Sequence, residues 1–184
     1  AWNGGWVWNE ISDILRYQRY SVSTPTLTGL GEKKHLLSSK ITIETFIEDV
    51  VNHIIFENLN NIILVGHSFA GSVISGVADR LKDRIQKLIY FDAMILIDGQ
   101  KPFDITPKET VEQRIELAKK FGNNISIPAP SADAFGVFDI KKSLLLEEKL
   151  TPHPLSAFQS KLILKNEVGN GIPLSYIICK KPIY

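Results

Sequence analysis

A serine lies among small residues where the chain passes from an apolar run into an amphipathic one. The segment reads "NIILVGHSFAGSVISGVADRL", in which Gly66 and Ala70 stand two residues to either side of Ser68, and Gly71 follows. A serine on a sharp turn between a strand and a helix has an exposed hydroxyl and a strained backbone, and its neighbours two positions away must be small. The pattern therefore predicts a nucleophilic serine, with an ordinary turn and a capping serine as the alternative.

The residue after the serine adds a second feature of such a site. We expect the N–H group of Phe69 to lie at the start of the following helix, where the helix dipole favours negative charge. An oxyanion formed when Ser68 attacks a carbonyl group would accept a hydrogen bond from this N–H group. Phe69 is therefore predicted to form part of an oxyanion hole.

The elements that position this serine alternate between helices and strands. Helical spacing predicts helices over residues 8–18, 42–57 and 69–81. Apolar runs predict strands at "NIILVG" and "KLIYFDA", each buried on both faces, and a further strand at "LSYIICK". A short strand is also expected in "YSVSTPTL". This alternation indicates an α/β fold in which helices cover both faces of a mostly parallel sheet.

A polar stretch from about residue 100 to 165 separates the strands predicted at "KLIYFDA" and "LSYIICK". It is mostly helical in its spacing and is too long for a simple crossover between two strands. We therefore expect a single domain over residues 1–184, in which this stretch forms a helical lid over the carboxyl ends of the strands.

Composition argues against several classes of protein. The chain carries 21 basic and 20 acidic side chains, for a net charge of +1, and no basic stripe, so nucleic acid and membrane surfaces are not expected as partners. The single cysteine, Cys179, excludes a disulfide or a cysteine-built zinc site within the chain. No apolar run reaches the ~18 residues of a membrane span. We expect a cytoplasmic protein, and the sequence indicates no oligomeric state.

Six segments together resemble the small esterase group of the α/β-hydrolase family, which includes plant methyl esterases and hydroxynitrile lyases. Bacterial esterases of that group are the most similar. The matching segments are "AWNGGWVW", "TPTLTGLGEKKHL", "DVVNHI", "ILVGHSFAGSVISGVADR", "LIYFDAMILIDGQ" and "LTPHPLSAF". The resemblance implies an α/β-hydrolase fold, Ser68 as the nucleophile, and an oxyanion hole formed by the N–H groups of Ala1 and Phe69.

The same resemblance bears on the two ends of the chain. In the family, a strand and a His-Gly pair precede the segment that matches "AWNGGW", and the catalytic histidine follows one further strand after "LSYIICK". The resemblance therefore implies a chain truncated at both ends, without the first strand and without the C-terminal strand and helix. It also implies that the catalytic histidine lies outside these 184 residues.

The acid of the catalytic triad has three candidate positions. Many family members carry it after the strand equivalent to "LSYIICK", where this sequence has "KKPIY" and no carboxylate. In the wider fold the acid can instead follow the strand after the serine's helix, which points to Asp92 at the end of "KLIYFD". Asp98, expected to be a turn residue before Gly99, and a carboxylate beyond Tyr184 stay open.

None of the four histidines is predicted to be the base. His67 adjoins Ser68, and its side chain is expected to point away from the hydroxyl; His53 lies on a predicted helix. His153 is expected to be a loop residue of the lid, and His35, on a loop near the strand ends, could contact substrate or be structural. The predicted pocket residues are Trp2, His35, His67 and Met94.

The leading hypothesis is a serine hydrolase that cleaves a small carboxylic ester through an acyl-enzyme on Ser68, with Asp92 orienting the histidine. This chemistry needs no metal and no cofactor, and its expected partner is a small-molecule ester. One alternative is a catalytically inactive α/β-hydrolase fragment or binding protein, which the missing strand and base favour. A second is a hydroxynitrile lyase-like activity, although no lysine can be assigned to it.

Overall fold

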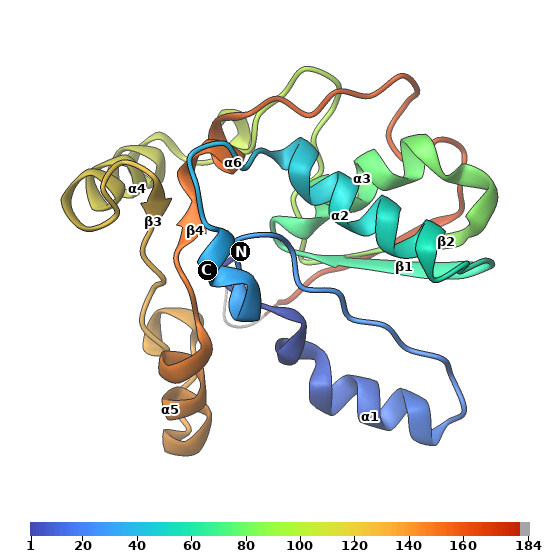
Figure 1. Ribbon diagram of the computed structural model, residues 1–184, viewed down its shortest axis with the longest axis horizontal. Helices are drawn as coiled ribbons and strands as arrows, with labels where there is room; N and C mark the ends of the chain where they lie inside the picture. Colours follow the sequence, from blue (N-terminus) through green and yellow to red (C-terminus); the bar gives the residue numbers. More distant parts are fainter. Residues whose placement is uncertain (181–184) are drawn as a thin grey trace.

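The centre of the molecule is a three-stranded parallel sheet (Figure 1). A computed structural model describes residues 1–180. The strands are β1 (Ile62–His67), β2 (Ile85–Phe91) and β5 (Leu174–Ile177), in the order β1-β2-β5. Gly66 and His67 at the end of β1 pair with Tyr90 and Phe91 at the end of β2, so both strands end at the same edge of the sheet.

Two helices build the packed side of this sheet. Helix α3 (Ala70–Arg80) lies on β1 and β2, and α2 (Ile43–Phe56) packs against α3. α2 begins at a capping box, because the side chains of Thr42 and Thr45 satisfy each other's backbone N–H groups at the helix start. Its apolar residues recur at helical spacing and are buried, and residues 71–78 of α3 are buried too. The predicted helices therefore exist and carry the core.

The other side of the sheet is only partly covered among residues 1–180. Leu88 and Tyr90 of β2 are fully buried, whereas Ile63 and Val65 of β1 are 49% and 42% exposed. The prediction that the "NIILVG" strand is buried on both faces is therefore wrong. The reason is the pleat of the strand, which points alternate side chains to opposite faces, while α2 and α3 cover only one of them.

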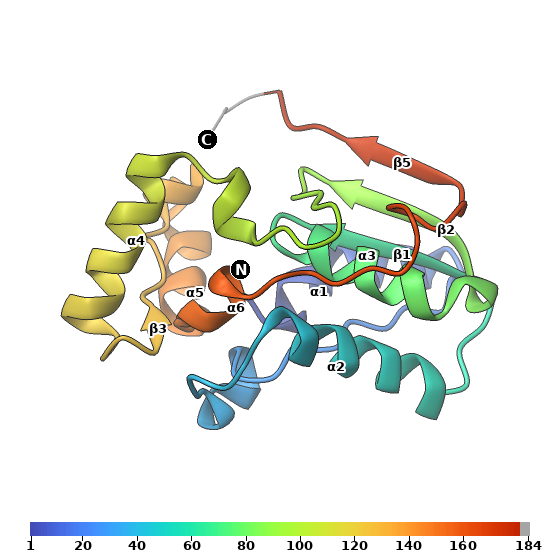
Figure 2. The ribbon, with the colours of Figure 1, turned by 90° about the horizontal axis from the view of Figure 1, so that it is seen from above.

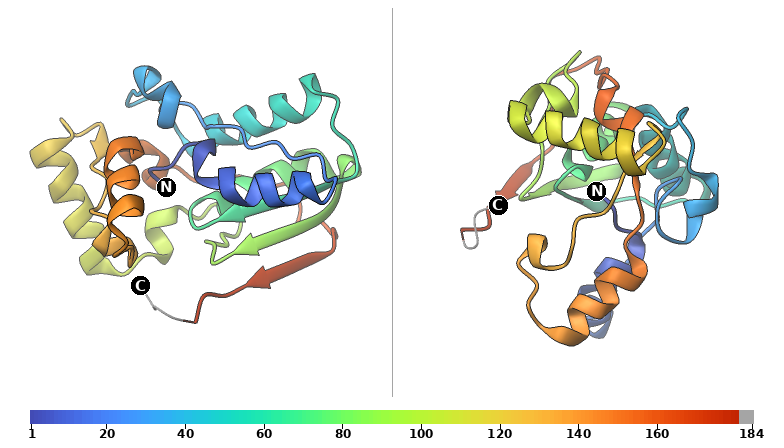
Figure 3. Two further views of the ribbon diagram at one scale, coloured as in Figure 1. Left: turned by 90° about the horizontal axis from the view of Figure 1, so that it is seen from below. Right: turned by 90° about the vertical axis from the view of Figure 1, so that its left-hand side faces the viewer.

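Helix α1 (Asn9–Tyr17) lies on the opposite side of the sheet from α2 and α3 (Figures 1 and 3). Its bounds match the predicted helix, but Ile11 and Ile14 of its apolar side are exposed, and its buried residue is Ser12. The segment "YSVSTPTL" that follows α1 forms no strand, so that prediction is wrong. A β-propensity run becomes a strand only when a neighbouring strand accepts its backbone hydrogen bonds, and none lies beside it among the described residues.

The segment between β2 and β5 is mostly helical, as predicted. It contains η4 (Pro102–Ile105), α4 (Lys108–Phe121), β3 (Ser126–Ile127), η5 (Asp133–Phe135), α5 (Ile140–Lys149), β4 (His153–Pro154) and α6 (Leu155–Gln159). β3 and β4 pair antiparallel as a small second sheet. Figure 2 shows α4, α5 and α6 beyond the carboxyl ends of β2 and β5. We call residues 100–165 the cover segment. The remaining short helices are η1 (Gly5–Trp8), η2 (Gly31–Leu36) and η3 (Lys82–Arg84).

The first turn of α3 approaches the chain just beyond β2 very closely. A Cβ atom on Gly71 would lie 2.4 Å from the carbonyl oxygen of Met94 and 2.7 Å from the Cβ of Ala93. Only glycine allows this approach, which brings the start of α3 against the end of β2. Among residues 1–180, no helix is long and apolar enough to cross a membrane.

Gly71→Ala should therefore destabilise the protein although alanine favours helix. Overlap with the backbone of Met94 should lower the free energy of unfolding by about 1–3 kcal/mol, measured by urea unfolding. Ser72→Ala is the matched control in the same turn, because the Ser72 hydroxyl is buried without a hydrogen-bond partner among the described residues. Its removal should be neutral or stabilising. Equal stability of Gly71→Ala and the parent would contradict the close approach.

Candidate active site

Ser68 occupies a strained turn between β1 and α3, with a positive φ of 54°. Its N–H group donates to the carbonyl oxygen of Phe91 (3.2 Å). Its own carbonyl oxygen accepts hydrogen bonds from the N–H groups of Gly71 (3.1 Å) and Met94 (2.9 Å). Three bonds thus hold a backbone conformation that serine adopts only at a cost. The strained strand-to-helix turn expected from the spacing of small residues is present.

The residues beside Ser68 fit the same turn. A Cβ atom on Gly66 would lie 2.7 Å from the carbonyl oxygen of Ala70, so a larger side chain two residues before the serine would clash. Phe69 is the N-cap of α3, and its N–H group therefore has no acceptor within the helix. Its ring is 2% exposed and points into the core, where it packs edge-on against Phe46 at 5.8 Å.

Asp92 follows β2 at the position beside Ser68 on the neighbouring strand. His67 and Phe91 are register partners, so Ser68 and Asp92 are the next residues along two paired strands. Asp92 also has a positive φ, 42°, and its N–H group donates to the carbonyl oxygen of Ile177 (2.7 Å). Its carboxylate accepts a long hydrogen bond, 3.4 Å, from the N–H group of Cys179. The half-buried carboxylate therefore lies at the edge where β1, β2 and β5 end.

Asp98 has a different setting. It is exposed, and its carboxylate accepts a hydrogen bond from the N–H group of Leu164 (2.8 Å). This bond joins the chain just before the cover segment to the end of that segment. The adjoining turn matches the sequence prediction, since Gly99 has a positive φ of 78°. The position beyond Tyr184 that the sequence left open lies outside the described residues.

Three histidines lie away from the Ser68 hydroxyl or at the surface. The His67 ring contacts Phe91 (5.3 Å between centroids) and Trp8 (6.5 Å). Partial burial lowers the pKa of His67, and the carboxylate of Asp92 opposes this shift. His35 is exposed on η2, and His53 on α2 makes a short hydrogen-bond contact with the hydroxyl of Ser23.

The N-terminal loop joins the cover segment through Trp2. The Trp2 indole donates to the carbonyl oxygen of Ile127 (3.2 Å), and the Trp2 carbonyl oxygen accepts from the N–H group of Thr151 (3.1 Å). Trp2 is 7% exposed and has a positive φ of 62°. The loop predicted to supply an oxyanion donor is thus fixed against β3 and the end of α5.

Two polar residues that the sequence analysis did not select lie in this region. His153 belongs to β4 and is fully buried, so the prediction that it is a loop residue is wrong. Its ring lies 4.8 Å from that of Phe69. Arg114 of α4 stacks over the rings of Trp2 (5.5 Å) and Phe158 (4.9 Å). His153 lies in the segment "LTPHPLSAF", but its burial could not be predicted, because the contacts that surround it join segments distant in the sequence.

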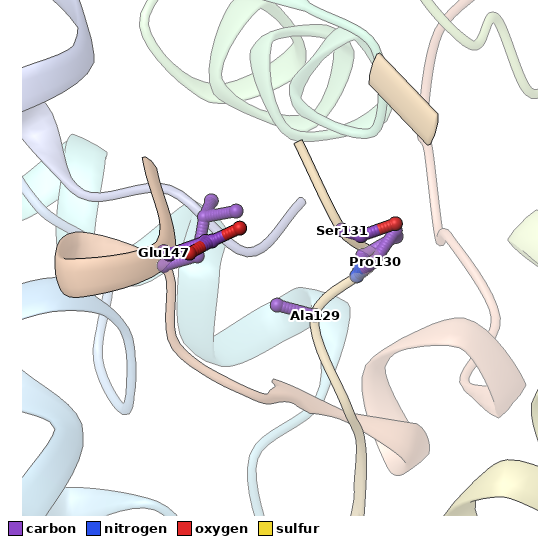
Figure 4. A pocket seen from close by; sticks show the side chains of 5 residues that line it. Ala129, Pro130, Ser131 and Glu147 are labelled. Carbon is purple, nitrogen blue, oxygen red and sulfur yellow. The ribbon is translucent and has the colours of Figure 1, made fainter. Parts of the chain in front are cut away.

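A pocket in the cover segment lies apart from the predicted site residues. This pocket has a volume of about 270 Å³ and is lined by Ala129, Pro130, Ser131, Glu147 and Leu150, between the chain after β3 and α5 (Figure 4). None of the predicted site residues lines it. Among residues 1–180, no group of three or more histidine, cysteine or acidic side chains is arranged to hold a metal ion.

Comparison with protein families gives one match over most of the chain. Residues 1–158 match the model of the "Alpha/beta hydrolase family". The chain is 36% identical over 174 residues to the carbendazim hydrolyzing esterase of Nocardioides sp. (strain SG-4G), covering 89% of this chain and 70% of that protein. It is 33% identical to putative methylesterase 14, chloroplastic, of Arabidopsis thaliana, covering 58% of this chain and 31% of the relative.

Solved structures agree in fold. An extracellular alpha/beta-hydrolase from a Paenibacillus species matches with a TM-score of 0.84 and 31% identity, over 96% of this chain and 73% of that one. Tomato methylketone synthase I matches with a TM-score of 0.75 and 16% identity, over 100% of this chain and 77% of that one, which supports the fold alone.

The buried histidine should make stability depend on pH. Burial, and to a smaller extent the charge of Arg114, lowers the pKa of His153 well below its usual 6.5, so His153 is neutral in the folded protein at neutral pH. Below pH ~6.5 the unfolded chain binds a proton that the folded protein does not, so the free energy of unfolding should fall by up to about 1.4 kcal/mol per pH unit. Above that pH the contribution is constant.

Urea unfolding between about pH 5 and about pH 7.5 measures this slope. His153→Gln should flatten it, whereas His35→Gln, at an exposed histidine, should not. Identical pH profiles for His153→Gln and the parent would show that His153 is not buried neutral.

Proposed function

The chain belongs to the alpha/beta hydrolase family as one of its carboxylic ester hydrolases, and we propose that it cleaves small carboxylic esters through an acyl-enzyme on Ser68. The observation that carries this proposal is the strained turn at Ser68. It holds the residue between β1, β2 and α3 at the edge where the strands end. In α/β sheets, ligands bind outside the carboxyl ends of the strands, so the hydroxyl is presented where a substrate can reach it.

The proposed reaction begins with attack of the Ser68 Oγ on the carbonyl carbon of the ester. A tetrahedral oxyanion forms, and the N–H groups of Phe69 and Ala1 donate hydrogen bonds to it. The alcohol leaves, and water then hydrolyses the acyl-serine. An imidazole base accepts the proton of the Ser68 hydroxyl and gives it to the departing alcohol, and it then accepts a proton from the attacking water and returns it to Ser68. We assign this base to a histidine outside the printed sequence, as the family resemblance implies.

We propose Asp92 as the acid that orients this imidazole. Its support is positional, because Asp92 and Ser68 follow paired residues on adjacent strands. The carboxylate is bonded to the N–H group of Cys179 only weakly, at 3.4 Å, and so retains acceptor capacity. Asp98 is less suited to the role because Leu164 already engages its carboxylate at 2.8 Å.

The substrate is proposed to be a small ester held between the strand ends and the cover segment, which acts as the lid. Met94 and Trp2 are proposed pocket residues. The N–H group of Met94 donates a hydrogen bond to the carbonyl oxygen of Ser68, and the indole of Trp2 donates one to Ile127 of the lid. His67 and His35 are weaker members of the proposed pocket, because both are exposed. The cytoplasmic location stays a prediction from the sequence. So does the expectation that neither nucleic acid nor a membrane is a partner.

Ser68→Ala should abolish ester turnover. Loss of the nucleophile typically lowers kcat by ~10⁵ to 10⁶, with 4-nitrophenyl acetate as the assay substrate and the protein at the length its cell makes. Ser72→Ala is the control, because that serine lies one turn away with its side chain buried in α3. Unchanged turnover in Ser68→Ala would overturn the mechanism. Cyanohydrin cleavage without ester hydrolysis would favour a lyase. A parent protein with neither activity would favour a binding protein.

Asp92→Asn should lower kcat by ~10² to 10⁴, because an asparagine cannot hold the imidazole in the tautomer that accepts the serine proton. Asp98→Asn is the matched control and should keep kcat within about threefold, with any loss in stability from the weakened bond to Leu164. A larger loss of kcat in Asp98→Asn than in Asp92→Asn would identify Asp98 as the acid. Small losses in both variants would indicate that the acid is a carboxylate beyond Tyr184.

A further inference from the structure

Arg114 of α4, which is half-buried, and His153 of β4, which is fully buried, lie in one aromatic cluster. The guanidinium of Arg114 lies 4.9 Å from the ring centroid of Phe158 and 5.5 Å from that of Trp2. The imidazole of His153 lies 5.0 Å and 6.2 Å from the same two rings. The two polar groups therefore share two aromatic neighbours, although they come from different elements of the cover segment.

Neither group has a polar partner among residues 1–180. The Nη1 atom of Arg114 and both ring nitrogens of His153 are buried without a hydrogen bond, and Arg114 forms no ion pair in the described chain. Burying a donor without a partner is unfavourable, and burying an unpaired cation is more so. Stacking on Trp2 and Phe158 offsets part of this cost but supplies no acceptor. The arrangement is that of a site for an anionic ligand.

Arg114 and His153 adjoin Phe69, one residue of the proposed oxyanion hole, and Trp2, the neighbour of the other. The ring of Phe69, the residue after Ser68, lies 4.8 Å from that of His153. Trp2, the residue after Ala1, contacts both members of the pair. An anion bound at Arg114 would thus lie beside Phe69 and Trp2, the residues that follow Ser68 and Ala1 in the chain.

We infer that Arg114 and His153 bind a second carboxylate on the acyl part of the ester, so that the substrate class is the monoesters of dicarboxylic acids. This inference rests on the proposed function. Arg114 supplies the charge and a hydrogen bond, and the neutral imidazole of His153 supplies one N–H donor. The rings of Trp2 and Phe158 exclude water and strengthen both bonds. An apolar acyl chain would leave both donors unpaired, and a cation would be repelled by Arg114.

Binding of the product diacid tests the site without requiring catalysis. Calorimetry on the protein at the length its cell makes, carrying Ser68→Ala, measures the Kd of succinate, glutarate and adipate, with butyrate as the monocarboxylate reference. At least one diacid should bind roughly 10- to 100-fold more tightly than butyrate, the range expected for a charge-assisted pair of hydrogen bonds. Arg114→Met should remove this preference and leave butyrate binding nearly unchanged.

Two further variants separate the site from general effects of charge and folding. Lys119→Met removes one exposed positive charge from the same helix and should leave the diacid preference intact. His153→Phe keeps an aromatic ring in the cluster but removes both nitrogens, and should weaken diacid binding while preserving the near-ultraviolet circular dichroism of the folded chain.

The binding and turnover measurements together distinguish failure of the anion site from failure of the proposed mechanism. Diacids that bind no better than butyrate, no diacid binding at millimolar concentration, or equal losses in Arg114→Met and Lys119→Met would each overturn the inference. Tight diacid binding in Ser68→Ala, together with ester turnover that Ser68→Ala leaves unchanged, would retain the anion site and reject the proposed mechanism.

Discussion

The left-handed backbone of Ser68 is the constraint on which the rest of the site depends. A non-glycine residue with φ of 54° is disfavoured by roughly 1–3 kcal/mol and persists only where the surroundings over-determine it. Here the N–H group of Ser68 bonds β2, and its carbonyl oxygen is bound by both the first turn of α3 and the chain after β2. If any of these three contacts is loosened, the serine can relax and the hydroxyl loses its fixed direction.

That constraint explains the small residues around the turn. Gly66 avoids the carbonyl oxygen of Ala70, and Gly71 lets α3 approach the backbone of Met94, whose N–H group in turn binds Ser68. The same approach sets the start of α3, and hence the N–H group of Phe69, relative to the strand ends. Local sequence and close packing therefore act on one geometry rather than on separate features.

The second organising contact joins the N-terminal loop to the cover segment. Trp2 donates to β3, accepts from Thr151, and packs with Phe158 and His153. A single aromatic cluster thus connects the loop that carries Ala1 to β4 and α6 of the cover segment. The buried His153 and the half-buried Arg114 in this cluster raise its energetic cost, which is the physical ground for proposing that it binds a ligand.

The sequence by itself predicted most of the elements and the strained turn that carries Ser68. Helix periodicity, the Thr42 cap and the spacing of Gly66, Ser68 and Gly71 are local properties, so α2, α3 and the strained turn could be predicted from neighbouring residues alone. Asp92 could be selected because a carboxylate directly after a buried strand is also a local pattern.

Only the tertiary structure decided which faces are covered and which distant groups meet. The exposure of Ile63 and the missing strand in "YSVSTPTL" depend on what packs or pairs beside them, which no local pattern encodes. The burial of His153 and its pairing with Arg114 likewise arise from contacts between α4, β4 and the N-terminal loop. Burial and electrostatics are sums over neighbours in space, so residues far apart in the sequence acquire a shared function only when the fold brings them together.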